Sequence, residues 1–204
     1  MSENPIDRPS QAEFLKLLNA RQGHFRFESG HPGNLWLDLD LLLLRPKRIE
    51  PFVTELARKI SSFGIDAVCG PMVGGALIAQ TIALALEVDF LYTERIVPQN
   101  RDALYPVVYG LPGHLRTLIR GRRIAIVDDV INAGSAICGT LNELDSLGAR
   151  TIVIGALLVL GEAGAKYFAE RDLPVQGVSY LPNEIWVPEN CPLCSSQIPL
   201  DDQE

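Results

Sequence analysis

Apolar residues follow two kinds of spacing, one before about residue 66 and another after it. In the first part, a capping box followed by an apolar stripe predicts a helix over residues 10–20. Residues 23–28 and 35–39 alternate between apolar and polar side chains on either side of a Gly/Pro turn, which predicts two strands. Apolar positions at helical spacing after Pro46 predict a second helix that ends at Gly64.

After residue 66, short apolar runs alternate with helical segments. The predicted strands are 67–69, 88–92, 123–127, 151–159 and 175–180, and the predicted helices are 75–86, 135–147 and 164–170, with residues 95–122 irregular. Strands that are apolar on both faces and alternate with helices indicate crossover connections. We therefore predict an α/β fold with an open, mainly parallel sheet, helices on both faces, and ligands bound beyond the carboxyl ends of the strands.

Length and composition limit the organisation and the classes of function. A chain of 204 residues indicates one domain, which we divide into an N-terminal helix with hood strands at 1–45, an α/β core at 46–182 and a tail at 183–204. An apolar fraction of 47% excludes intrinsic disorder, and a net charge of -7 argues against nucleic acid or an anionic membrane as a partner. The N-terminus lacks the apolar core of a signal peptide and no apolar run is long enough for a membrane span, so we expect a cytoplasmic protein.

The segment 124–136 carries the strongest chemical signal. An apolar strand ends in Asp128 and Asp129, and a loop containing Gly134 and Ser135 then opens a helix. Backbone N–H groups at such a helix start suit a phosphate, and the serine adds a hydroxyl. Two carboxylates beside a phosphate would repel it unless they bind sugar hydroxyls or Mg²⁺, so a sugar phosphate fits the pattern. The alternative is that the two acids only cap the turn.

A second turn between a strand and a helix, at residues 70–75, contains three glycines that can expose backbone N–H groups to an anion. It lacks the Gly-Lys-Ser/Thr ending of a nucleoside-triphosphate loop. Such a turn suits a pyrophosphate, and the alternative is a tight turn that binds no ligand.

These motifs carry a family resemblance. The block VDDVINAGSA at 127–136 resembles the phosphoribosyl pyrophosphate signature of type I phosphoribosyltransferases. GHFRFESG at 23–30, LWLDL after it, GPMVGG at 70–75 and GAR before the next strand follow in the order of the orotate phosphoribosyltransferases, so the resemblance covers about residues 23–180. It implies the type I fold with a small N-terminal hood, and an enzyme that transfers phosphoribosyl from phosphoribosyl pyrophosphate to a nucleobase, most closely orotate.

The resemblance also implies roles for individual residues. Asp128 and Asp129 would hold the ribose hydroxyls. The 5-phosphate would bind the loop made by Ile131, Asn132, Ala133, Gly134, Ser135 and Ala136. The pyrophosphate would bind Gly70, Pro71, Gly74 and Gly75, and the hood over the base would contain Ser29, Gly30 and Trp36. Mg²⁺ would bind mainly through the substrate pyrophosphate, and a homodimer would let a loop of one subunit reach its neighbour's site.

The segment 95–123 departs from the family. Orotate enzymes have lysines in a mobile loop here, whereas this chain has six arginines against one acid and no lysine between Lys59 and Lys166. Arginine can clamp pyrophosphate and stabilise charge on a leaving group. We therefore predict Arg95 and Arg101 as catalytic residues together with Asp128, and a lid over residues 95–110. The remaining candidates are explained more simply as surface residues before a strand: Arg120, Arg122 and Arg123.

Two alternatives remain open for the function. The acceptor could be a purine or another pyrimidine, or the chain could be a regulator that binds phosphoribosyl pyrophosphate or a nucleotide without catalysis.

The tail contains Cys191 and Cys194 in a C-x-x-C spacing, which resembles half of a zinc site. Structural zinc needs four ligands. The three histidines, His24, His31 and His114, are scattered along the sequence. We therefore assign no metal ligand to the protein.

Overall fold

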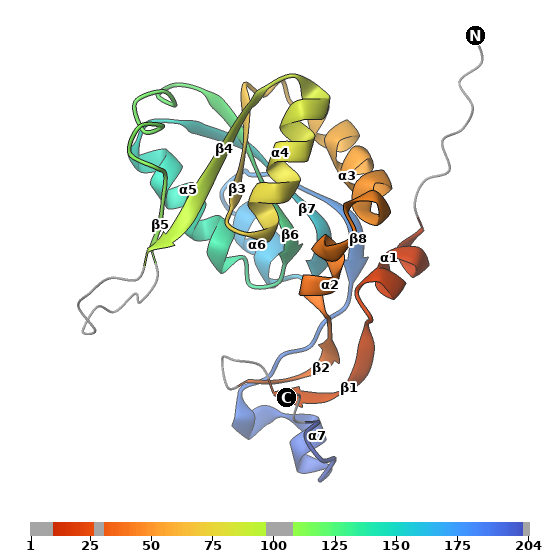
Figure 1. Cartoon of the computed structure of the whole chain (residues 1–204). Helices are drawn as coiled ribbons and strands as arrows, with labels where there is room; N and C mark the ends of the chain where they lie inside the picture. Colours follow the sequence, from red (N-terminus) through yellow and green to blue (C-terminus); the bar gives the residue numbers. More distant parts are fainter. Residues whose placement is uncertain (1–9, 27–30, 97–107, 202–204) are drawn as a thin grey trace.

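The computed structural model describes residues 10–26, 31–96 and 108–201. In this described part, six strands form one sheet in the order β5-β4-β3-β6-β7-β8, and two further strands form a separate antiparallel hairpin, β1-β2. All neighbours in the large sheet are parallel except β4 and β5. Helices cover both faces (Figure 1). This confirms the predicted open, mainly parallel α/β sheet with a small N-terminal hood.

The strands are β1 (Arg21–Arg26), β2 (Pro32–Trp36), β3 (Ala67–Pro71), β4 (Asp89–Ile96), β5 (Val108–Gly110), β6 (Arg123–Ile131), β7 (Arg150–Leu160) and β8 (Val175–Leu181). The helices are α1 (Gln11–Leu17), α2 (Leu39–Leu44), α3 (Pro46–Ser61), α4 (Gly74–Leu86), α5 (Ser135–Ser146), α6 (Ala163–Ala169) and α7 (Pro192–Ser195), with a 3-10 turn at Pro188–Asn190. Among the described residues, no helix combines the length and the apolar character that crossing a bilayer would require.

Alternating strand residues build a separate core on each face of the sheet. Val68 and Val127 face the layer formed by α1, α2, α3 and α4, where Phe14 and Phe52 pack with ring centroids 4.8 Å apart. Cys69 belongs to the opposite layer, with side chains of α5 and α6. Both faces of the strands are therefore buried, as their continuous apolar runs predict.

Local signals account for the helix ends. Ser10 accepts a hydrogen bond from the Glu13 N–H while the Glu13 carboxylate accepts from the Ser10 N–H, so the predicted capping box is present at α1. Pro46 starts α3, where its missing N–H has no intrahelical partner to lose.

Several elements differ from the prediction. The second predicted hood strand, 35–39, is observed as β2 at Pro32–Trp36, and the 3-10 turn and α7 lie in the tail, for which no element was predicted. The apolar run Leu39–Leu44 forms α2, which the sequence analysis did not foresee. Within the segment predicted to be irregular, Val108–Gly110 forms β5 and pairs with the end of β4. The acids at 128 and 129 do not end β6, because its pairing with β7 continues to Ile131 opposite Val159.

The C-terminal tail returns to the hairpin β1-β2, which we call the hood. The Asn34 N–H donates to the Glu184 carbonyl at 3.3 Å, and the Asp201 N–H donates to the His24 carbonyl at 2.6 Å. Figure 1 shows the hood and α7 together beyond the carboxyl ends of β6, β7 and β8. The tail and the N-terminal strands therefore form one structural unit at the edge where ligands of such sheets bind.

Candidate active site

The glycine turn after β3 and the two acids of β6 lie against each other. A Cβ atom added to Gly74 would overlap the Asp129 carboxylate, and one added to Gly75 would lie 2.8 Å from Asp128 Oδ1. A Cβ atom added to Gly70 would overlap the Gly75 carbonyl, and Pro71 is the last residue of β3. Glycine is required at these positions because the turn and the two carboxylates approach each other too closely for a side chain. The turn predicted to bind pyrophosphate and the acids predicted to bind ribose are therefore neighbours at the start of α4.

The two carboxylates have contrasting surroundings. Asp128 is 9% exposed, whereas Asp129 is only partly buried. Burial raises the pKa of Asp128 well above its usual value, and the neighbouring Asp129 carboxylate raises this pKa further. The Asp129 N–H donates to Asp128 Oδ1 at 3.0 Å and the Val130 N–H donates to Asp129 Oδ1 at 2.7 Å. The acids are thus fixed to their own backbone in the strand rather than capping a turn.

The loop after β6 makes a second N-terminal site at α5. Gly134 adopts a left-handed conformation with φ of 79° directly before Ser135, the first residue of the helix. Ala133 and Ser135 are exposed, Asn132 and Ala136 are partly buried, and Ile131 is buried. Asn183, which follows β8, donates from Nδ2 to Asn132 Oδ1 at 3.3 Å and ties the loop to the sheet. The loop has the backbone that anion binding needs.

Arg95 and Tyr109 face each other across the antiparallel pair β4-β5. Burial raises the pKa of the Tyr109 phenol, the Arg95 guanidinium opposes this rise, and the Asp128 carboxylate adds to it. Both charged groups are therefore close enough to act on one phenol. Tyr109 also packs on Gly139 of α5, where a Cβ atom would overlap its ring. The sequence analysis missed Tyr109, because a short antiparallel strand in an irregular segment leaves no periodic signal.

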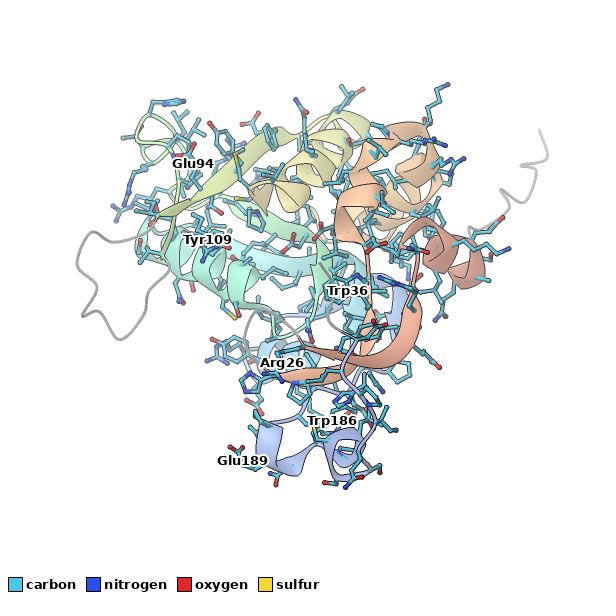
Figure 2. All side chains as sticks on the ribbon, turned by 60° about the horizontal axis from the view of Figure 1, so that its bottom comes forward. Arg26, Trp36, Glu94, Tyr109, Trp186 and Glu189 are labelled. Atoms are coloured by element: carbon cyan, nitrogen blue, oxygen red, sulfur yellow. The ribbon has the colours of Figure 1, made fainter. Side chains whose placement is uncertain are left out.

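The hood supplies Trp36. Its ring lies 5.8 Å from that of Phe25, centroid to centroid, and its indole N–H donates to Asp38 at 2.8 Å. Figure 2 shows Trp36 on the hood side of the molecule and Tyr109 on the β5 side. Ser29, Gly30 and Arg101, together with most of the predicted 95–110 lid, lie outside the described residues.

One hollow beside the hood is lined by none of the predicted site residues. It has a volume of about 470 Å³ and is lined by Leu15, Lys16, Asn19, Ala20, Gln22, Leu35, Leu181 and Pro182. Because successive strand residues point to opposite faces, Trp36 faces away from the side that Leu35 lines.

Three of the remaining arginines have structural partners. Arg122 forms an ion pair with Asp89, and Arg123 donates to the Phe63 carbonyl. Arg116 forms an ion pair with Glu143 at 3.3 Å. Arg95 differs from these three in its place, because it lies near the end of β4 opposite Tyr109.

The arrangement combines two carboxylates with a helix N-terminus on either side of them. Backbone N–H groups at the start of α4 and of α5 can each receive an anionic group, and the carboxylates between them can accept hydrogen bonds from hydroxyls. A ligand with hydroxyls in its middle and phosphate groups at both ends matches this order.

A family model described as the phosphoribosyl transferase domain matches residues 43–193. The chain belongs to this family. A similar curated relative is the orotate phosphoribosyltransferase of Caldanaerobacter subterraneus subsp. tengcongensis, with 28% identity over 187 residues, 92% of this chain and 91% of the relative. Family and relatives together identify an enzyme, a phosphoribosyltransferase.

Solved structures agree with the phosphoribosyltransferase fold. Orotate phosphoribosyltransferase from Aeropyrum pernix superposes with a TM-score of 0.66 at 22% identity, covering 84% of this chain and 94% of that one. Adenine phosphoribosyltransferase from Thermoanaerobacter pseudethanolicus superposes with a TM-score of 0.67 at 20% identity, covering 84% and 100%. The fold is thus shared by enzymes named for different bases.

Proposed function

We propose that this phosphoribosyltransferase acts on orotate. It would join the ring nitrogen of orotate to the anomeric carbon of phosphoribosyl pyrophosphate, and that nitrogen would lose its proton to solvent. The bond from the anomeric carbon to the pyrophosphate oxygen breaks, and pyrophosphate leaves with the electron pair. The products would be orotidine 5'-phosphate and pyrophosphate, and the reaction belongs to pyrimidine nucleotide synthesis. The observation that carries the proposal is the similarity to curated orotate phosphoribosyltransferases over nine tenths of both chains.

The site residues have roles that follow from their chemistry. Asp128 and Asp129 would accept hydrogen bonds from the ribose hydroxyls, and the loop 131–136 would bind the 5-phosphate through backbone N–H groups at the start of α5. The turn 70–75 would bind pyrophosphate. Because the sugar carbon becomes cation-like as pyrophosphate leaves, the protein contributes positioning and charge stabilisation, and Arg95 and Arg101 would stabilise the leaving group.

The donor set fits Mg²⁺ bound together with the substrate. The Asp129 carboxylate lies at the start of α4, next to the turn proposed for pyrophosphate, and carboxylate and phosphate oxygens are the ligands that Mg²⁺ prefers. When bound, Mg²⁺ would neutralise charge on the leaving pyrophosphate. Most of its ligands would come from the substrate, with Asp128 and Asp129 as the nearest protein groups.

A second candidate is the same transfer to another base. The superposition on an adenine phosphoribosyltransferase favours it, as does the replacement of the expected loop lysines by arginines. The difference would lie in the hood and the loop, not in the sugar phosphate site.

A panel of bases separates these candidates. The enzyme is incubated with phosphoribosyl pyrophosphate, Mg²⁺ and one of orotate, uracil, adenine, guanine or hypoxanthine, and pyrophosphate release is measured. Release with orotate alone is the expected result. Release with a purine alone would move the proposal to the second candidate, and no release with any base would contradict both and favour a phosphoribosyl pyrophosphate-binding regulator.

A further inference from the structure

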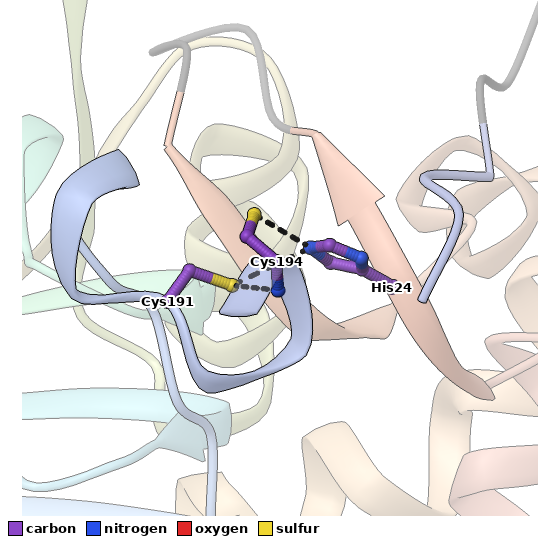
Figure 3. A group of neighbouring side chains, drawn as sticks. All are labelled: His24, Cys191 and Cys194. Carbon is purple, nitrogen blue, oxygen red and sulfur yellow. Dashed lines mark hydrogen bonds between the residues drawn. The ribbon is translucent and has the colours of Figure 1, made fainter. Parts of the chain in front are cut away.

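Three side chains that can bind a metal lie close together between the hood and α7, although they are far apart in the sequence. His24 lies on β1, and Cys191 and Cys194 lie at the start and in the middle of the short helix α7 (Figure 3). Their ligand atoms all lie within 4.8 Å of one another, and both thiols are free. His24 and Cys191 are 3% and 1% exposed, and Cys194 is exposed. His24 is therefore far from the two cysteines in the sequence but next to them in the structure.

The hydrogen bonds of His24 fix which ring nitrogen can bind a metal. Nδ1 lies 2.7 Å from the Ile198 carbonyl oxygen. Since a carbonyl cannot donate a proton, Nδ1 must carry the hydrogen, which leaves Nε2 as the nitrogen that can offer a lone pair to a metal. Nε2 lies 3.4 Å from both Cys191 Sγ and Cys194 Sγ. A backbone carbonyl that orients the far nitrogen is the usual support of a metal-binding histidine.

We propose that His24, Cys191 and Cys194 form a zinc site that fastens the C-terminal tail to the hood. Tetrahedral Zn²⁺ with its usual bond lengths separates a histidine nitrogen from a cysteine sulfur by about 3.6 Å, and the structure has 3.4 Å for both pairs. Two thiolates and one imidazole favour zinc over magnesium or calcium. The protein supplies three of the four ligands that structural zinc needs, and a water molecule would supply the fourth.

The surrounding backbone supports the same geometry. The Cys194 N–H donates to Cys191 Sγ at 3.3 Å, so the backbone of α7 holds the two cysteines in a fixed relative position. The Asp201 N–H donates to the His24 carbonyl, so the segment after α7 also lies along β1. The site is therefore built at a junction of three segments that backbone hydrogen bonds already hold together. Binding would release the thiol protons and stabilise the junction.

Metal content of the full chain tests the proposal. Protein purified under reducing conditions without a metal-affinity tag should contain about one zinc per chain. After chelation, Co²⁺ should rebind with tetrahedral visible bands and a thiolate-to-cobalt charge-transfer band in the near ultraviolet. Loss of a group that only orients a ligand costs about 10- to 100-fold in affinity, so Cys194→Ser and His24→Gln should each weaken binding by at least that factor.

Cys138→Ser is the matched control, because Cys138 is a partly buried thiol on α5 outside this cluster. It should keep both the metal and the charge-transfer band. Cys194 is exposed, so its replacement leaves a folded protein to measure, checked by circular dichroism. A metal-free wild type that takes up neither Zn²⁺ nor Co²⁺ at micromolar concentration, a Co²⁺ complex without the charge-transfer band, or a Cys191–Cys194 disulfide in the reduced preparation would overturn the proposal.

Discussion

At the residue scale, Asp128 is the clearest case of a side chain held in unfavourable surroundings. It is 9% exposed and lies beside a second carboxylate, so its charged form costs folding free energy at neutral pH. Its carboxylate accepts from the Asp129 N–H, which leaves other lone pairs for a ligand. Such a residue is typical of a binding site. It lowers the free energy of unfolding of the unliganded protein, and a ligand that binds only the native state raises this free energy again.

The raised pKa of Asp128 predicts a pH dependence of stability. Because the native pKa lies above the unfolded one, the native state binds more protons than the unfolded state between the two values. The free energy of unfolding should therefore fall as pH rises through this window, by at most about 1.4 kcal/mol per pH unit. Asp128→Asn should flatten this slope and Asp129→Asn should flatten it in part, measured by denaturant unfolding at a series of pH values. An unchanged slope in Asp128→Asn would show that the carboxyl titrates normally.

Replacing both acids tests their role toward the ligand. The double variant Asp128→Asn, Asp129→Asn should stay folded, because it removes a buried charge repulsion. It should bind phosphoribosyl pyrophosphate more weakly, since losing a hydrogen bond to a charged acceptor costs about 1.5 to 3 kcal/mol. Titration calorimetry measures the change. Equal affinity in the folded variant would remove these acids from the site.

Arg95 is predicted to act mainly on the transition state. Arg95→Ala should lower kcat much more than it raises KM for phosphoribosyl pyrophosphate, because charge on the leaving group develops during the reaction. Arg122→Ala is the matched control, since that arginine pairs with Asp89 at the amino ends of the strands, opposite the edge that carries the site. This variant should change kcat little. If Arg95→Ala raised only KM, the residue would be a binding charge and Arg101 would remain the candidate for catalysis.

At the element scale, the site depends on how closely the start of α4 approaches β6. This contact is possible because Gly74 has no side chain where the Asp129 carboxylate lies. The acids are not mobile loop residues but part of a strand that pairs on to Ile131. Their position is thus set by the sheet, which gives the site a rigid base.

Gly74→Ala should therefore reduce activity by displacing the Asp129 carboxylate. We expect at least about a tenfold loss of kcat/KM, equivalent to about 1.4 kcal/mol, with the free energy of unfolding changed less than in a buried-core substitution. Gly113→Ala is the control, because an added Cβ atom there meets no atom within 4 Å. Steady-state kinetics and urea unfolding of both variants give the comparison. Full activity in Gly74→Ala would mean that the carboxylate can move without consequence.

The elements that the sequence predicted correctly are those with a local signal. The capping box of α1, Pro46 of α3 and the apolar runs of β3, β6 and β7 all depend on neighbours in the chain. β5 did not have such a signal, because three residues become a strand only through pairing with β4. The full length of β6 was missed for the same reason, since the pairing partner decides where a strand ends.

The candidate site, like the fold, was predictable where its residues form short motifs in the sequence. Asp128, Asp129 and the two glycine turns are short motifs, and their contact follows from the neighbouring positions of β3 and β6. His24 was not predictable as a neighbour of Cys191, because the two residues are 167 positions apart and meet through the folding of the tail onto the hood. The C-x-x-C spacing offers two possible ligands, but it does not indicate whether a third ligand lies beside them or which residue supplies it.

At the scale of the whole molecule, we expect a homodimer. Closed two-fold dimers are the commonest soluble oligomers, and α4 has an exposed apolar face with Leu77 and Leu84, 47% and 82% exposed, two turns apart. Light scattering at micromolar concentration should give twice the chain mass. Leu84→Glu should shift the population toward monomer, whereas the same change at Leu118, also exposed but outside this helix face, should not. A monomeric wild type would contradict the prediction.

The return of the tail to the hood also has a consequence for the order in which the protein is made. Strands β1 and β2 leave the ribosome early, but the residues that hydrogen-bond to them, Glu184 and Asp201, leave it only after the strands of the large sheet. An isolated two-stranded hairpin is marginally stable in water, and domains fold from the N-terminus as they are synthesised. The hairpin β1-β2 should therefore become stable only after residues 184–201 have been synthesised. A chain truncated before residue 184 and released from the ribosome should carry a folded α/β core and an unformed hood.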